Sequence, residues 1–169
     1  LIGPKRVEAP KDLLFGGATH DLRIKKTFLD EKMRAKSRCC FYSHYSPPCR
    51  NETKGAATER GEDKAKKVED DMLVWTRTVS LCRVHHAVGD AFSLEQKHPT
   101  PFLEMECTKE LLSLPGIFMV TFDVGEDLGQ STRHKRLLIT NQPWLAKLSN
   151  DCGGGSTPKM VKKWCSQYA

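Results

Sequence analysis

The stretch MLVWTRTVSLCRV, residues 72–84, decides the fold that the sequence predicts. Four large apolar side chains fall at odd-numbered positions, and threonine, serine and cysteine fall between them. A period of two, together with several β-branched residues, is typical of a strand that buries one face. The stretch therefore predicts a strand whose inward residues are Leu73, Trp75, Val79 and Leu81.

Shorter segments further along the chain predict more strands. They cover residues 91–94, 102–107, 117–122 and 135–140. The segment 117–122 is apolar at successive positions, which is typical of a central strand covered on both faces. The expected fold class is α+β and β-rich, with a mostly antiparallel sheet that is sandwich-like or barrel-like.

A helix is expected before this sheet, over residues 21–36, with Asp21 as its cap. Its apolar side chains recur at helical spacing. The expected apolar stripe consists of Leu22, Phe28 or Leu29, and Met33. A strand through Phe28 is the alternative.

A polar connector follows over residues 51–71, where 12 of 21 side chains are charged. Such a segment buries too little apolar surface to fold alone, so we expect an exposed loop with at most a short helix over residues 62–70. Residues 1–71 are expected to form a helical and loop region, and residues 72–169 a β-rich domain. The two parts are either separate or one continuous domain.

The positive charge is concentrated at the end of the chain. Residues 129–169 carry seven Lys or Arg against one Asp, which accounts for the whole net charge of +6. A region of one sign attracts anionic partners, although it also serves as a solvated face that maintains solubility. The expected binding residues are Arg133, Lys135, Arg136, Lys159, Lys162 and Lys163. A short terminal helix with Met160, Val161 and Trp164 on its apolar face is expected in this region.

Seven cysteines are expected to form disulfides that stabilise the fold. They are Cys39, Cys40, Cys49, Cys82, Cys107, Cys152 and Cys165. Structural zinc sites usually contain a C-x2-C pair, and the chain has none. A zinc site at Cys82 with His85 and His86, and a reactive thiol beside His44, are the alternatives. Because seven is odd, one thiol is expected to be unpaired within the chain.

The protein is expected to be secreted and extracellular. Asn51 begins an Asn-Glu-Thr glycosylation triplet in the polar connector, the first residue is Leu instead of Met, and Lys5-Arg6 is a dibasic pair. Charged residues interrupt every apolar run before it reaches the length of a membrane span.

The sequence contains few signs of a catalytic site. The sequence contains no P-loop, no G-x-G-x-x-G and no G-x-S-x-G motif, and neither a metal nor a cofactor is expected. Histidine with a carboxylate is the usual pair for acid–base chemistry, so the alternative is a small secreted nuclease or other hydrolase. Its residues would be His134 or His85, with Glu104 as the carboxylate.

In general character the chain resembles the small, cysteine-bearing secreted proteins through which parasites and plant pathogens act on hosts. The resemblance implies an effector-like or ligand-like role in virulence. We therefore expect a disulfide-stabilised binding protein without catalysis that recognises a protein receptor or host target through its loops and its basic C-terminal face. The target would be acidic or polyanionic, nucleic acid is not the expected partner, and the oligomeric state is left open.

Overall fold

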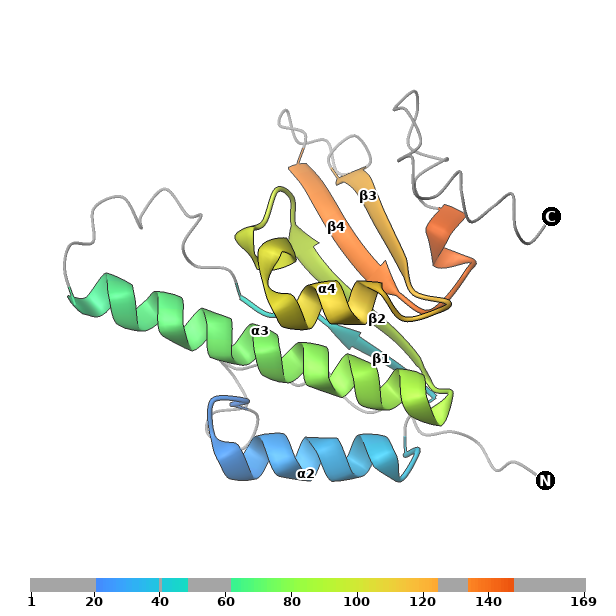
Figure 1. Cartoon of the computed structure of the whole chain (residues 1–169), viewed down its shortest axis with the longest axis horizontal. Helices are drawn as coiled ribbons and strands as arrows, with labels where there is room; N and C mark the ends of the chain where they lie inside the picture. The colour runs from blue at the N-terminus through green and yellow to red at the C-terminus, as the bar shows by residue number, and fades with distance from the viewer. Residues whose placement is uncertain (1–20, 40, 49–61, 125–133, 148–169) are drawn as a thin grey trace. The chain divides into compact units, whose positions relative to one another are not determined.

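The computed structural model of the chain describes residues 21–39, 41–48, 62–124 and 134–147 (Figure 1). These residues form three α-helices, two short 3-10 helices and a four-stranded mixed sheet, and about 52% of the described residues are helical. The fold class is therefore α+β, but the expectation of a mostly antiparallel, β-rich protein is wrong.

The elements follow one another in a simple order. They are α2 (Lys25–Lys36), β1 (Tyr42–Tyr45), α3 (Glu62–Val88), β2 (Ala91–Lys97), η4 (Pro101–Glu104), α4 (Glu106–Leu112), β3 (Phe118–Val124), β4 (His134–Thr140) and η5 (Leu145–Lys147). Two compact units divide the chain: residues 1–43 with 47–91, and residues 44–46 with 92–169. The first holds α2 and α3, and the second holds most of the sheet with η4, α4 and η5. The boundary expected between residues 71 and 72 falls inside α3.

The predicted strand over residues 72–84 is wrong, because this stretch is the second half of α3. Its buried side chains recur every three or four residues, as they do on one side of a helix. They include Asp71, Val74, Trp75, Thr78, Cys82 and His85. Val74 is 2% exposed and Leu73 is 38% exposed, which is the reverse of the order that the strand required. An alternating strand would also have placed Arg77 on the apolar face.

The hydroxyl groups of two threonines in α3 form hydrogen bonds with backbone carbonyls of the same helix. The hydroxyl of Thr76 donates to the carbonyl oxygen of Met72 at 2.9 Å, and that of Thr78 donates to Val74 at 2.8 Å. Bonds of this kind to the residue four positions earlier let β-branched polar residues lie within a helix. The β-branched content that indicated a strand is therefore compatible with the helix.

Gly89 ends α3 in a left-handed conformation. Its φ is +77°, its N–H donates to the His86 carbonyl at 3.1 Å, and the Asp90 N–H donates to the His85 carbonyl at 2.9 Å. Glycine is favoured at such a helix end because it has no Cβ to clash. The turn leads directly into β2.

The sheet has the strand order β1-β2-β4-β3, and both β2 and β3 pair with β4 in antiparallel orientation. The strands expected over residues 91–94, 117–122 and 135–140 are confirmed as β2, β3 and β4. The expectation that residues 117–122 form the central strand is wrong, since β3 lies at the edge. β4 lies inside the sheet instead, and its residues 137–140 are all buried.

Both faces of the sheet bury apolar side chains. The register places Leu94 beside Ile139 on one face and Leu138 beside Val120 on the other. On the second face, Leu145 and Ala146 from η5 pack with Val120 and Leu138 to form a small core. The helix α4 lies in front of the strands in the view of Figure 1.

The strand expected over residues 102–107 is also wrong. The segment forms η4 and the start of α4, and its buried residues are Phe102, Thr108 and Leu111. The Thr100 side chain accepts a hydrogen bond from the Phe102 N–H at 3.3 Å, directly before Pro101. A threonine cap followed by proline at the first position favours a helical turn over a strand.

The expected disulfide stabilisation is wrong for the part of the chain that the structure describes. Cys39, Cys82 and Cys107 are free thiols. Cys82 lies on the buried side of α3, and Cys107 lies in the first turn of α4, so neither is on the strand that was expected. The other four cysteines lie outside the described residues, as does the expected C-terminal helix.

Candidate functional site

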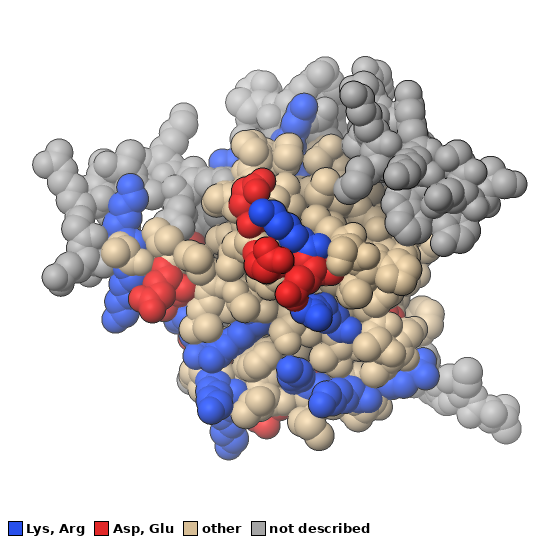
Figure 2. Space-filling model, viewed as in Figure 1, with Lys and Arg blue, Asp and Glu red and all other residues tan. Residues whose placement is uncertain are grey.

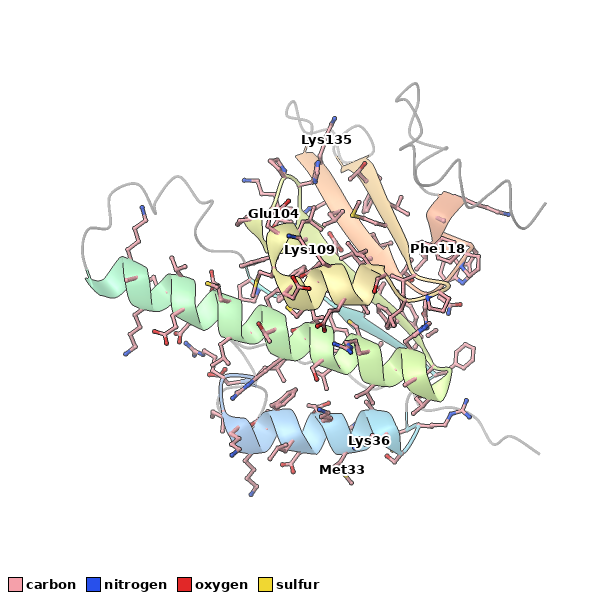
Figure 3. The ribbon with its side chains drawn as sticks, viewed as in Figure 1. Met33, Lys36, Glu104, Lys109, Phe118 and Lys135 are labelled. Carbon is pink, nitrogen blue, oxygen red and sulfur yellow. The ribbon has the colours of Figure 1, made fainter. Side chains whose placement is uncertain are left out.

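One side of α2 combines exposed apolar and basic side chains. At 3.6 residues per turn, five residues lie within roughly 100° of the helix surface. This set, here called the α2 outward face, consists of Lys25, Lys26, Leu29, Met33 and Lys36. Leu29 is 46% exposed and Met33 is 64% exposed, and the three lysines are exposed as well. In Figure 3, Met33 lies on the side of α2 that faces away from α3.

The opposite side of α2 packs on α3 through small residues. Thr27 and Ala35 are the buried residues of this helix. The helix predicted over residues 21–36 is confirmed, but the expected apolar stripe is not the buried side, because Leu29 and Met33 face solvent. Small side chains let two helix backbones approach closely, so this contact does not need the large ones.

The charge around the α2 outward face is positive. α2 contains five Lys or Arg and two acidic residues. Figure 2 shows Lys and Arg side chains gathered over the part of the molecule that α2 forms. Among the described residues, neither Lys25, Lys26 nor Lys36 pairs with a carboxylate. Within the described part of the chain, these cations are therefore available to an anionic partner.

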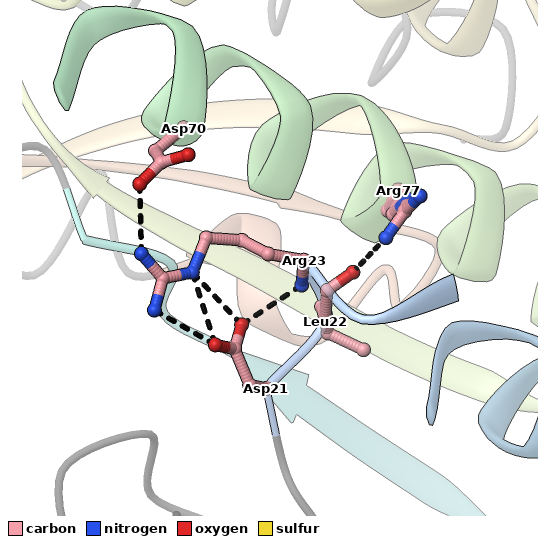
Figure 4. Close-up of polar contacts among 5 residues, drawn as sticks. All are labelled: Asp21, Leu22, Arg23, Asp70 and Arg77. Carbon is pink, nitrogen blue, oxygen red and sulfur yellow. Dashed lines mark hydrogen bonds and ion pairs between the residues drawn. The ribbon is translucent and has the colours of Figure 1, made fainter. Parts of the chain in front are cut away.

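Ion pairs hold the segment that leads into α2 (Figure 4). Arg23 Nη1 lies 2.7 Å from Asp70 Oδ2 on α3, and Arg23 Nη2 lies 2.7 Å from Asp21 Oδ2. The hydrogen bonds to Asp21 and Asp70 raise the pKa of Arg23 above its ordinary value, so the cation persists. Asp21 is not the helix cap that the sequence predicts. Ile24 is at that position, and Asp21 Oδ1 accepts from the Arg23 N–H at 2.8 Å.

Arg77 provides a second attachment between α3 and the beginning of α2. Its guanidinium donates to the carbonyl oxygen of Leu22 (Figure 4) and lies 5.2 Å from the centre of the Phe28 ring. A cation over an aromatic face is attractive, and the half-buried Phe28 is covered in this way. Arg77 thus helps to determine which side of α2 is turned outward.

The segment that follows α2 is attached to Asp90, two residues after the end of α3. Arg38 has a φ of +56°, and its Nε lies 3.2 Å from Asp90 Oδ1. The Asp90 side chain is only 3% exposed. With attachments at both ends, α2 presents its outward face as a preorganised surface.

A second group of polar side chains lies on the sheet and is here called the sheet polar cluster. It consists of His44, Ser93, Glu95 and Arg136. His44 Nδ1 lies 2.7 Å from Ser93 Oγ, and His44 Nε2 lies 3.5 Å from Glu95 Oε2. Arg136 Nε lies 3.6 Å from Glu95 Oε1. The hydrogen bond from His44, supported by the charge of Arg136, lowers the pKa of Glu95 despite its partial burial.

The sheet polar cluster contains a serine, a histidine and a carboxylate, which are the residue types of a hydrolase triad. A nucleophile must be reachable by its substrate, however, and Ser93 is 1% exposed. The Ser93 hydroxyl and the Glu95 carboxylate contact opposite ring nitrogens of His44. These contacts connect β1 to β2. The arrangement is better suited to fixing an edge strand than to catalysis.

The residues expected for the alternative hydrolase lie on different elements of the structure. His85 is 2% exposed. Burial lowers its pKa, although the negative charges of Asp90 and Glu31 act in the opposite direction. Glu104 lies in the other unit, where its exposed side chain pairs with Lys109 at 3.2 Å (Figure 3). His134 begins β4, and its side chain lies outside the description.

Few of the expected binding residues fall within the described part of the chain. Lys135 is exposed on β4 (Figure 3), and the charge of Arg136 is partly compensated by Glu95. Arg133, Lys159, Lys162 and Lys163 lie outside the described residues, as does the glycosylation triplet at Asn51.

The alternative zinc site receives no support from the geometry around Cys82. The Cys82 thiol is fully buried, and this burial raises its pKa. Across the described ranges, no group of three His, Cys, Asp or Glu side chains is arranged to hold a metal ion. No helix within those ranges is both long and apolar enough to cross a membrane.

Comparison of the chain with protein families, with curated proteins and with solved structures finds no match. The α2 outward face was missed by the sequence interpretation, which placed recognition in the C-terminal region. The signal was present as lysines at 25, 26, 32 and 36 around Leu29 and Met33. The side that α3 covers depends on tertiary contacts, so the pattern alone could not mark this side as exposed.

Proposed function

We propose that the chain is a binding protein that recognises an acidic partner protein through the α2 outward face. The observation that carries the proposal is the exposure of Leu29 and Met33 among lysines that pair with no carboxylate of the described residues, on a helix that is attached at both ends. The expected role in protein–protein recognition is retained, and the recognition surface is moved from the C-terminal region to α2.

The composition of this face suits a protein partner. Protein interfaces usually have an apolar centre and a polar rim, and methionine is enriched in them because its side chain adapts to different shapes. Leu29 and Met33 would form the centre, and Lys25, Lys26 and Lys36 the rim. Cations at a rim select a partner of opposite charge and accelerate its approach.

The compartment stays a prediction from sequence. Cys39, Cys82 and Cys107 are free, so these cysteines no longer argue for an oxidising environment. The proposal does not depend on secretion, because the α2 outward face contains no cysteine.

Site-specific crosslinking tests the proposal. A photoreactive amino acid is placed at position 33, and a control carries it at the exposed position 64 of α3. Each protein is irradiated in an extract of the source organism, and products are identified by mass spectrometry. A candidate that crosslinks only from position 33 is then purified, and its binding to the unlabelled chain is measured by calorimetry.

We expect an acidic protein that binds the wild-type chain and binds the Lys26→Glu/Lys36→Glu variant at least about tenfold more weakly, since reversing two rim charges turns attraction into repulsion. The matched control Lys64→Glu/Lys66→Glu changes the net charge equally and should bind like the wild type. Equal crosslinking from both positions, or equal loss of affinity in both variants, would refute the proposal.

A further inference from the structure

We infer that the partner presents an acidic amphipathic helix to the α2 outward face. The inference rests on the proposed function and specifies the element of the partner that is recognised. It follows from the spacing of the side chains along α2 and from the positions of the charges beside them.

The spacing matches that of a helix-pairing seam. Residues 26, 29, 33 and 36 are separated by three, four and three positions, which is the spacing of side chains along the contact between two packed helices. Leu29 and Met33 occupy the centre of this seam, and lysines occupy both ends. The seam spans roughly 15 Å, because each helical residue rises by about 1.5 Å, and about three turns of a partner helix would cover it.

The flanks of the seam differ in charge. Lys25 and Lys32 lie along one flank, and Asp30 lies on the other. Lys32 Nζ lies 5.6 Å from the centre of the Phe28 ring, and this contact restrains its side chain. Charged positions beside a seam select partners and set their orientation. A partner helix would therefore carry apolar residues opposite Leu29 and Met33, and Glu or Asp opposite the lysines.

Two other anionic partners suit the face less well. Insertion into a lipid surface requires a broad apolar face, and here two large apolar side chains lie beside the exposed carboxylate of Asp30. Binding of nucleic acid depends on cations that contact successive phosphates, and the centre of this face is apolar. An acidic helix uses both the apolar centre and the lysines.

Two synthetic helical peptides, which differ only in charge, test the inference with the 169-residue chain. Both carry leucine at the two positions opposite Leu29 and Met33. The acidic peptide has Glu at the positions opposite the lysines, including Lys26 and Lys36, and the basic peptide has Lys there. Binding is measured by fluorescence anisotropy with wild type, with Lys26→Glu/Lys36→Glu and with the matched control Lys64→Glu/Lys66→Glu. Circular dichroism checks that each surface variant remains folded.

The wild type should bind the acidic peptide, and affinity should fall about tenfold or more in Lys26→Glu/Lys36→Glu while the control variant is unchanged. The charge-reversed variant should instead prefer the basic peptide. Equal binding of both peptides by the wild type would overturn the inference, as would tighter binding to vesicles of anionic lipid or to a short RNA.

The two proposals fail in different ways. If a purified partner depends on Lys26 and Lys36 but no acidic helical peptide binds, recognition through α2 stands and the helix inference is refuted. If neither the partner nor the acidic peptide distinguishes the charge-reversed variant from its control, both are refuted.

Discussion

Replacing Val74 by alanine should destabilise the protein far more than replacing its neighbour Leu73. Val74 is 2% exposed on the buried side of α3, and Leu73 is 38% exposed. A strand with the alternation of residues 72–84 would reverse this order, because Leu73 would point inward and Val74 outward. The two substitutions therefore distinguish the helix from the strand at adjacent positions.

The magnitudes follow from burial. Val74→Ala removes two buried methyl groups at about 0.8 kcal/mol each, and the cavity that remains raises the loss to about 2 kcal/mol or more. Leu73→Ala removes a larger but partly exposed side chain, and substitutions near the surface usually change stability by about 0.5 kcal/mol. Alanine also favours a helix slightly more than leucine does, which offsets part of that loss.

Urea unfolding followed by far-ultraviolet circular dichroism measures both variants against the wild type. We expect the free energy of unfolding to fall in both, with Val74→Ala losing at least about three times as much as Leu73→Ala. A larger loss in Leu73→Ala would refute the helical register of α3. Equal losses would also contradict it, since the two positions would then be equally buried.

Other consequences of the structure can be measured in the same protein. Gly89→Ala should lower the free energy of unfolding by about 1 kcal/mol because Gly89 has a φ of +77°, and thermal unfolding at matched pH would show no change if the turn were ordinary. The pKa of His85 is lowered below its ordinary 6.5, so the unfolded chain binds the proton more readily and stability should fall as pH decreases through 6.5. Urea titrations of wild type and His85→Gln at pH 7.5 and 5.5 test this, and an equal pH response in both would contradict it. Alkylation followed by mass spectrometry should label exposed Cys39 in the native protein and buried Cys82 only on unfolding, whereas equal rates would contradict their burial.

The sequence pattern predicted some elements correctly because short-range signals favoured them, although a strand through Phe28 was left open as the alternative to α2. The second half of β4, residues 137–140, is a run of apolar and β-branched residues, and the large apolar residues Leu29 and Met33 of α2 are four positions apart. Residues 72–84 were misassigned because two periods coexist there. Val74, Trp75, Thr78 and Cys82 follow the helical period, and the odd-numbered apolar residues alternate. The charged residues 62–71 were assigned to a connector, which concealed that one 27-residue helix continues through them.

The candidate site was harder to predict than the elements. The net charge of the C-terminal region directed the interpretation away from α2, whose lysines are partly offset in the total by nearby acidic residues. Exposure of Met33 depends on which side of α2 packs on α3, and that choice is made by Arg23, Arg77 and Asp70. Contacts between residues about 50 positions apart leave no periodic signal in the sequence.

Nuclear magnetic resonance of ¹³C-methyl-labelled methionine tests the central claim most directly, because Met33 lies in the middle of the α2 outward face. The acidic helical peptide is titrated into the labelled protein, and Met33→Leu identifies the resonance. We expect the Met33 methyl signal to shift and saturate while that of Met72, which is 43% exposed on α3, stays in place. A Met33 signal that does not move, or equal shifts at both methionines, would contradict recognition through α2.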